Sequence, residues 1–241
     1  MLNNQSTGDS VSTTAPCGSG HSSWFVFIAC LFVTCLVTAN IISVKLIVIF
    51  GWVLPAGIII FPLSYITADI LTEVYGYAQA RRIIWLGFFC NLIAVAAIWL
   101  GKVAPPASFW DGQTAYAQIL GYTPRILAAS FAAYLVGEFL NAYIMAKMKM
   151  ATKGRWLWTR TIASTLVGQA LDSLFFITLA FWGTIPAGAL FLAIGMQWLA
   201  KSAYEAAATP LTYAAVRFLK RREGKDAYDR DTKFNPLSFR A

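Results

Sequence analysis

Apolar residues form six long runs along the chain, and short polar segments separate them. A transmembrane helix needs roughly 20 consecutive apolar residues, so each run is long enough to cross a bilayer. The predicted spans cover residues 24–49, 53–75, 83–100, 126–148, 161–182 and about 197–219. Residues 186–196 are too few to cross alone. We interpret them as an interfacial or re-entrant segment before the last span, or as an extension of that span.

The two ends of the chain lack this apolar pattern. Residues 1–23 are rich in Ser, Thr, Gly and Asn and contain no Lys or Arg. This composition predicts a disordered tail and argues against a cleavable signal peptide, which begins with basic residues. We therefore predict a disordered cytoplasmic tail over residues 1–23, a six-helix membrane domain over 24–222, and a polar cytoplasmic tail over 223–241.

Composition supports a membrane protein. The chain is 58% hydrophobic and 12% charged, whereas soluble domains are roughly 45–50% apolar and about 25% charged. Because lipid cannot hydrogen-bond a backbone, long apolar runs of this kind form helices. The predicted fold class is an all-α integral membrane protein with six transmembrane helices around a central polar binding cavity.

Basic residues predict the orientation. Of the 19 Lys and Arg residues, fifteen lie in the segment between spans two and three, in the segment between spans four and five, or in the C-terminal tail. Only Lys102 and Arg125 lie in the connections on the opposite face. Since basic residues near span ends stay cytoplasmic, both termini should be cytoplasmic. Topology and contact with anionic lipid also explain the net charge of +8 without a nucleic-acid partner.

Polar residues inside the spans are the main functional signal. A charge in a membrane helix is costly, so it usually faces a partner or a wet cavity. Residues three or four apart share a helix face. Four predicted helices carry polar residues at this spacing: Asp69 and Glu73; Glu138 and Asn141; Gln169 and Asp172; and Gln197, Lys201 and Glu205. We expect Asn40, in the first span, to join these polar stripes. The stripes predict a central functional cavity, and the alternative is that they only bridge helices.

Other residue types narrow the chemistry. The four cysteines lack metal-ligand spacing, and the one histidine, His21, lies in the N-terminal tail. We therefore expect no metal, no cofactor and no Ser–His catalysis. The chain has no glycine-rich ATP-binding loop either. An intramembrane enzyme that uses two carboxylates, or a scaffold without a ligand, remains as an alternative to a transporter.

Several ordered motifs resemble those of the queuosine precursor transporter family, which is also described as vitamin-uptake-like. They are Asn40; 61–65 (FPLSY); 69–76 (DILTEVYG); 80–82 (ARR); 163–169 (ASTLVGQ) with Asp172 and Phe175; 180–182 (AFW); and Gln197, Trp198, Lys201, Glu205, 209–210 (TP) and Tyr213. The resemblance extends over about residues 24–220 and several helices, which makes it specific.

The resemblance implies six helices similar to the substrate-binding components of energy-coupling-factor vitamin importers. It also implies a non-enzymatic importer in the bacterial inner membrane for 7-deazaguanine bases: the cyano or aminomethyl base, or queuine. Another vitamin-like or nucleobase-like substrate is the alternative. Partners would be the small-molecule substrate and membrane lipid, with either a homo-oligomer or a separate energy-coupling ATPase module.

A deazaguanine suits a polar cavity of this kind. Its ring N–H and exocyclic amine are adjacent donors that one carboxylate can accept together, and its carbonyl can accept from an amide or from Lys201. The first candidates for substrate binding or charge balance are Asp69, Gln169, Asp172 and Lys201. The second candidates are Asn40, Glu73, Glu138, Asn141 and Glu205.

Overall fold

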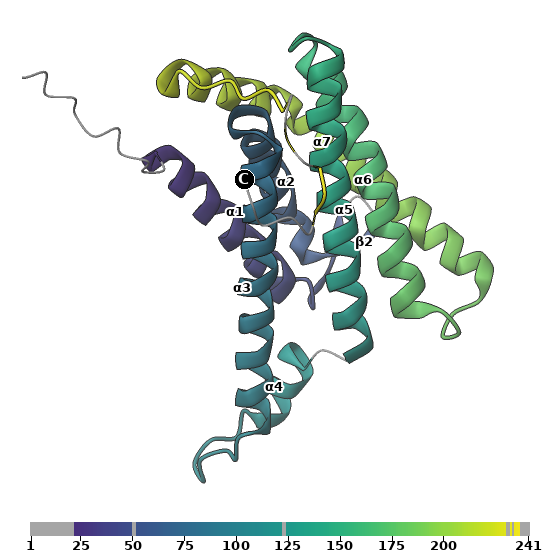
Figure 1. The fold of residues 1–241 in the computed structure, drawn as a ribbon. Helices are drawn as coiled ribbons and strands as arrows, with labels where there is room; N and C mark the ends of the chain where they lie inside the picture. Colours follow the sequence, from purple (N-terminus) through teal and green to yellow (C-terminus); the bar gives the residue numbers. More distant parts are fainter. Residues whose placement is uncertain (1–21, 50–51, 122–123, 230–231, 233, 237–241) are drawn as a thin grey trace, which may run out of the picture.

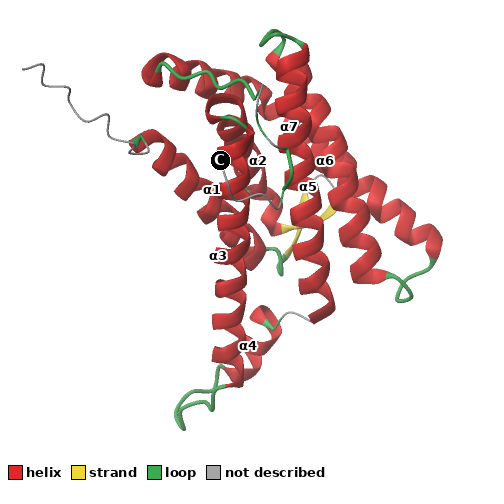
Figure 2. Cartoon of the chain, in the orientation of Figure 1, coloured by secondary structure: helices red, strands yellow, loops and turns green. Residues whose placement is uncertain are grey.

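The computed structural model describes residues 22–49, 52–121, 124–229, 232 and 234–236. Its helices are α1 (Ser23–Ile42), α2 (Phe61–Ile70), the π-helical turn η2 (Leu71–Tyr75), α3 (Tyr77–Val103), α4 (Gln113–Leu120), α5 (Pro124–Ala151), α6 (Leu157–Phe181) and α7 (Ala187–Glu223). A short hairpin of β1 (Leu46–Ile49) and β2 (Trp52–Pro55) and the 3-10 turn η1 (Ala56–Ile59) join α1 to α2. Figures 1 and 2 show a mainly helical bundle.

Four of the described helices, α1, α3, α5 and α6, are long and apolar enough to cross a membrane. The chain is therefore a helical membrane protein. The six spans expected from the sequence are not established by these four, because α2 has only ten residues before the π-helical turn begins. Helix α7 has 37 residues, but polar residues such as Lys201 and Glu205 interrupt its apolar sequence.

Helix α2 lies inside the bundle. Eight of its ten residues are buried, and it packs against α1, α5 and α7. A helix surrounded by other helices on this many sides can carry polar side chains without exposing them to lipid. Helices α3 and α5 run antiparallel beside each other, and α5 packs closely along α6 (Figure 1).

The hairpin corrects the predicted limits of the first two spans. We expected helix over residues 24–49 and 53–75, but α1 ends at Ile42 and the segment 46–55 forms two antiparallel strands. The run Ile47, Val48 and Ile49 is β-branched, which favours strand over helix. A short apolar run is compatible with either a buried strand or part of a helix, so hydropathy alone did not distinguish the two structures.

The segment before the last predicted span is also corrected. Residues 187–196 are not a separate element but form the first turns of a continuous α7. At about 1.5 Å per residue, its 37 residues extend over about 55 Å, well beyond the roughly 30 Å apolar layer of a bilayer. The continuous helix agrees with the alternative that this segment extends the helix predicted for residues 197–219.

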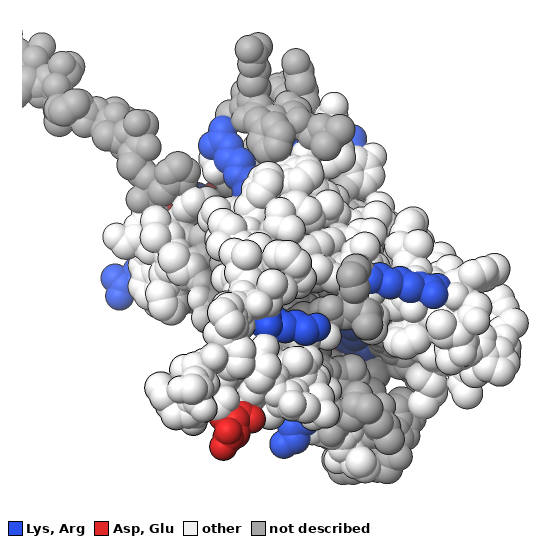
Figure 3. All heavy atoms as spheres, turned by 90° about the horizontal axis from the view of Figure 1, so that it is seen from below, with Lys and Arg blue, Asp and Glu red and all other residues white. Residues whose placement is uncertain are grey.

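The two ends of the bundle differ in charge. At one end, which we call the basic end, η2, α5 and α7 finish and α3 and α6 begin, and ion pairs join these segments. Most of the described basic residues belong to it. The opposite end, near α4, shows a largely uncharged surface with separate Lys and Arg side chains and one small, isolated acidic area (Figure 3).

Candidate functional site

Polar side chains from α2 and α5 meet in the middle of the bundle. Asp69 is fully buried, and the side-chain amide of Asn141 donates a hydrogen bond to its Oδ1 at 2.9 Å. Tyr65, one turn before Asp69, is also buried and lies in hydrogen-bonding contact with Gln169 of α6. These contacts join three helices through their polar groups.

An ion pair joins α6 to α7 beside these residues. Lys201 Nζ lies 2.5 Å from Asp172 Oδ2, and the two side chains are 17% and 8% exposed. The same ammonium group lies 4.6 Å from the centre of the Phe61 ring, which attracts cations through its π face. Lys201 is therefore held between α2 and α6 and already neutralises one carboxylate.

Two further carboxyl groups complete the set. Glu138 of α5 and Glu205 of α7 are only 1% and 2% exposed. Glu138 interacts electrostatically with Asp69, Asp172 and Lys201. Glu205 interacts with Asp69 and Glu138. The structure thus brings the predicted residues of four helices into one group, which we call the central cluster: Asp69, Glu138, Asn141, Gln169, Asp172, Lys201 and Glu205.

The central cluster is rich in acceptors that lack donors. Within the described residues, five of its buried oxygens have no hydrogen-bond partner: Asp69 Oδ2, Glu138 Oε2, Asn141 Oδ1, Gln169 Oε1 and Glu205 Oε1. Buried polar atoms are nearly always hydrogen-bonded, so unpaired ones require a partner such as a ligand, a proton or water. A ligand that fits here must present several donors.

Close contact between α5 and α6 sets the geometry of the cluster. A Cβ placed on Gly137 would lie 2.9 Å from the Cβ of Asp172 and 3.3 Å from the carbonyl oxygen of Gly168. A Cβ on Gly168 would lie 3.1 Å from the Cβ of Asn141. Because glycine has no side chain, the two backbones approach closely at these residues. Glu138, next to Gly137, is thereby brought near Asp172.

Glu73 lies outside the central cluster. It is fully buried at the basic end, where its Oε1 accepts from Arg160 at 2.8 Å and from Lys220 at 2.6 Å, and lies 3.5 Å from Lys149 Nζ. The sequence placed Asp69 and Glu73 on one α-helical face. The intervening turn is π-helical, with more residues per turn, so residues four apart no longer align. Asn40 is partly buried near the end of α1, a helix that packs on α2.

The C-terminal segment packs against the basic end, a feature that the sequence did not predict. Asp226 Oδ1 accepts from Lys149 at 2.5 Å and lies 2.8 Å from Lys220 Nζ. Partial burial works to raise the pKa of Asp226, but hydrogen bonds from Lys149 and Lys220 outweigh it and hold the pKa below its ordinary value. The sequence feature that pointed to such contacts is Glu73, an acid near the end of a predicted span, because a buried acid requires cations nearby.

The same segment caps helix α3. Both carboxylate oxygens of Asp229 accept from the backbone N–H of Tyr77, at 3.1 and 3.0 Å. A negative side chain is favourable at a helix N-terminus, where N–H groups lack partners. Gly76, just before, has φ of 85°, and a Cβ there would lie 3.1 Å from the Cβ of Ala227. Glycine is therefore required where the tail crosses the start of α3.

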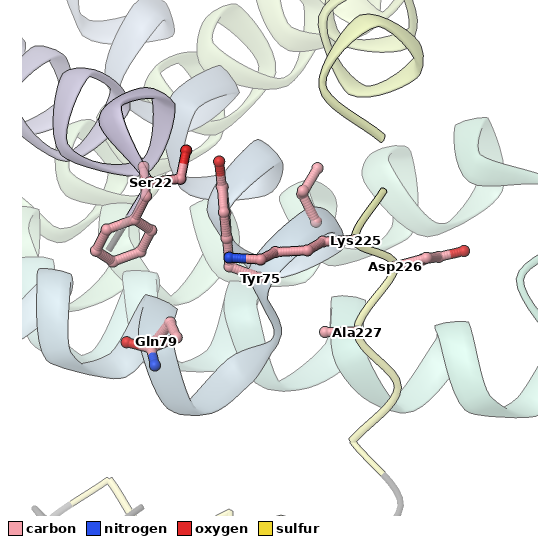
Figure 4. Close-up of a pocket in the computed structure, with 8 residues that line it drawn as sticks. Ser22, Tyr75, Gln79, Lys225, Asp226 and Ala227 are labelled. Atoms are coloured by element: carbon pink, nitrogen blue, oxygen red, sulfur yellow. The ribbon is translucent and has the colours of Figure 1, made fainter. Parts of the chain in front are cut away.

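A pocket of about 270 Å³ opens at the basic end, between the start of α1, η2 and the C-terminal segment. Figure 4 shows Lys225 extending toward Tyr75, with Ser22 and Gln79 on either side. None of the residues that line it belongs to the central cluster. The expected cavity at the cluster is thus not this pocket.

The described residues contain no group of three or more His, Cys, Asp or Glu side chains placed to hold a metal ion. The acids of the central cluster are close enough to interact, but they are not arranged as a metal site. The unpaired acceptors of the cluster favour binding of hydrogen-bond donors.

Comparison with known proteins gives consistent matches. A family model described as "Putative vitamin uptake transporter" matches residues 55–215. A protein of Bacillus subtilis (strain 168) named "Probable queuosine precursor transporter" is 32% identical over 86% of this chain and 89% of its own length. The "Queuosine precursor transporter" of Escherichia coli (strain K12) is 30% identical, over 52% of this chain and 54% of its own.

A third similar protein, from Haemophilus influenzae, is also named "Probable queuosine precursor transporter". It is 28% identical over 52% of this chain and 51% of its own length. No solved structure matches the chain significantly. All three relatives are named as transporters, in agreement with the expectation that this chain is not an enzyme.

Proposed function

The chain belongs to the vitamin uptake transporter family, and from this premise we propose that it imports queuosine precursors across the bacterial inner membrane. The proposed substrates are 7-deazaguanine bases: the cyano base, the aminomethyl base or queuine. Another vitamin-like or nucleobase-like molecule is the alternative substrate.

The observation that carries this proposal is the set of unpaired acceptors in the central cluster. Five buried oxygens from α2, α5, α6 and α7 lack donors within the described chain. A deazaguanine offers its ring N–H groups and an exocyclic amine, which are the complement of such a surface. Binding would replace the missing donors and remove the cost of leaving buried acceptors unpaired.

Each residue of the cluster then has a role. Asp172 accepts the paired donors of the ring edge, and Gln169, one turn away on α6, meets the same edge. Lys201 balances the charge of Asp172, which it contacts at 2.5 Å, or donates to the carbonyl of the base. Tyr65 lies beside Gln169 and offers an aromatic face for stacking. Asp69, Asn141, Glu138 and Glu205 are additional acceptors, and Asn40 is a secondary candidate. Glu73 pairs with cations at the basic end and lies outside this site.

We further propose six membrane crossings: α1, the α2–η2 unit, α3, α5, α6 and α7. An even number places the basic end and both termini in the cytoplasm, where basic residues are retained. Residues 24–222 form the transport domain, and the C-terminal residues 223–241 form a cytoplasmic tail. The predicted disordered tail over residues 1–23 lies almost wholly outside the described residues.

The energy source is either an ion gradient or a separate ATPase module, because the sequence lacks an ATP-binding glycine loop. Assembly into a homo-oligomer is compatible with either source.

Uptake of labelled deazaguanines into bacteria that cannot synthesise them tests the proposed function. Cells that express the protein should accumulate the label and incorporate it into tRNA, and cells that express Asp172→Asn should accumulate much less. Labelled adenine is the matched control, since its ring edge has a different donor pattern. Equal uptake of deazaguanines with and without the protein, at verified membrane expression, would refute the proposal.

A further inference from the structure

The central cluster contains more acid than base. Four carboxyl groups, Asp69, Glu138, Asp172 and Glu205, share it with one ammonium group, that of Lys201. All four acids are at least nine-tenths buried. Lys201 pairs with Asp172, and in the described part of the chain no cation contacts the carboxylates of the other three.

A buried carboxylate without a cation is costly, and such a group usually becomes neutral by binding a proton. Glu138 interacts electrostatically with each of the other three acids. The titratable or charged groups near it are Asp69 and Tyr65 on α2, Tyr134 on its own helix, Asp172 on α6, and Glu205 and Lys201 on α7. Three of them are acids, and the one cation, Lys201, already pairs with Asp172, so Glu138 in the empty site avoids an uncompensated buried charge by holding a proton.

Independent polar atoms point to a cationic ligand at the same place. The amide oxygens of Asn141 and Gln169, each in a side chain only 1% exposed, lack donors, as does Glu138 Oε2. A protonated amine carries a positive charge and three N–H donors. It would supply both the missing charge and the missing donors, which a neutral group cannot do.

We infer that the site selects bases bearing an ammonium group over neutral bases, because it exchanges a proton held on Glu138 for the ammonium cation. This inference rests on the proposed function and specifies the substrate class. The aminomethyl deazaguanine is such a base, and the cyano deazaguanine has the same ring without the charge. On binding, the Glu138 proton leaves to water and the carboxylate pairs with the ammonium group, so the charge within the site is unchanged.

Calorimetric binding of the two bases to the full-length protein in lipid nanodiscs tests the inference. At neutral pH the aminomethyl base should bind at least about thirtyfold more tightly than the cyano base, as expected for a buried charge-assisted contact. Titrations in two buffers of different ionisation enthalpy should show about one proton released per aminomethyl base bound, and none for the cyano base.

The pH dependence has a definite sign. Because binding releases a proton, affinity for the aminomethyl base should rise as pH rises from about 5.5 to 8, a range in which an amine with a pKa near ~10 stays charged. Affinity for the cyano base should change little over the same range.

Three variants locate the proton. Glu138→Gln should lose most of the preference for the aminomethyl base and its pH dependence, whereas Glu138→Asp, which can still ionise, should retain both. Asp111→Asn changes an exposed acid to its amide and should behave as the unaltered protein. If the Gln variant does not fold, an absence of proton release by the unaltered protein would still overturn the inference.

Three results would overturn the inference. Equal or tighter binding of the cyano base would exclude selection for a cation while leaving the proposed function intact. Preferential binding of the aminomethyl base without proton release would exclude exchange at Glu138. Binding of neither base would contradict the proposed function as well.

Discussion

The contact between Lys201 and Asp172 can serve the fold, the ligand or both. Its two atoms lie 2.5 Å apart between α6 and α7, and both side chains are largely buried. If the pair is mainly structural, removing one partner leaves an uncompensated buried charge at a cost of about 3–5 kcal/mol, and removing both is tolerated. If Asp172 also binds the base, its loss has a second effect on affinity.

We predict that Asp172→Asn folds but binds deazaguanine at least about thirtyfold more weakly, a loss of roughly 2 kcal/mol, because the new amide N–H opposes a ligand donor. Thermal stability and binding should be measured for this variant, for Lys201→Met and for the double variant. A double variant with normal stability and normal affinity would show that the pair is structural only.

A second prediction at this scale concerns Asp226. Its pKa in the folded protein is held below the ordinary value for Asp, which is about 3.9. At pH values above about 3.9 its contacts with Lys149 and Lys220 therefore stabilise the folded tail. This stabilisation is lost as the pH falls through the lowered pKa. Amide hydrogen exchange of residues 224–229 should therefore accelerate below about pH 4 relative to its intrinsic rate.

The Asp226→Asn variant is the control for this effect. Its amide cannot titrate, so protection of the tail should be weaker at neutral pH and should show a smaller additional loss on acidification. A tail in the variant that is protected as strongly as in the unaltered protein would rule out the contribution of these ion pairs.

At the scale of elements, the Gly137–Gly168 contact gives a third prediction. Gly137→Ala places a Cβ 2.9 Å from the Cβ of Asp172, closer than real Cβ contacts. Helices α5 and α6 must then separate, which should cost about 1–3 kcal/mol as other overpacked substitutions do. Unfolding of the purified variant measures the loss, and ligand binding should also weaken.

Gly195→Ala is the matched control, because a Cβ there meets nothing within 4 Å. Alanine has the higher helix propensity, so this variant of α7 should be at least as stable as the unaltered protein. If both substitutions change stability by the same amount, the close contact between α5 and α6 is not the reason that position 137 requires glycine.

The elements also show what the sequence could predict. Apolar runs located α1, α3, α5 and α6, because these helices face lipid over much of their surface and so read as hydrophobic. Helical spacing brought Asp69, Glu138, Asp172 and Glu205 together correctly, because each lies in regular α-helix. Spacing failed for Glu73, which lies in a π-turn that no residue type marks.

Contacts between distant segments could not be predicted in this way. The tail reaches Val74, Tyr77 and Lys149 over more than 70 residues of sequence, and a polar segment gives no periodic signal of the residues that it will contact. The hairpin was missed for a different reason: its short apolar sequence is compatible with a strand and with a helix.

For the whole molecule, we predict that the basic end faces the cytoplasm. A reporter that is active only in the cytoplasm should work when fused after Arg240, and one that is active only outside should work when inserted near Gly112, in the loop before α4. The two positions lie beyond opposite ends of the bundle under the six-crossing proposal. The reverse pattern of activity would show that the number or direction of crossings is wrong.

The ion pairs of Glu73 have a consequence for the order of assembly. Its partners Lys149, Arg160 and Lys220 follow it by 76, 87 and 147 residues. At roughly 5–20 residues per second, the ribosome needs about 7–30 s to make Lys220 after Glu73. During much of that interval Lys149 and Arg160 are already present to pair with the acid, but its last cation is still missing. The basic end can close fully only when the final helix is complete, and a chain released before Lys149 would present an unpaired acid to the cell's quality-control proteases.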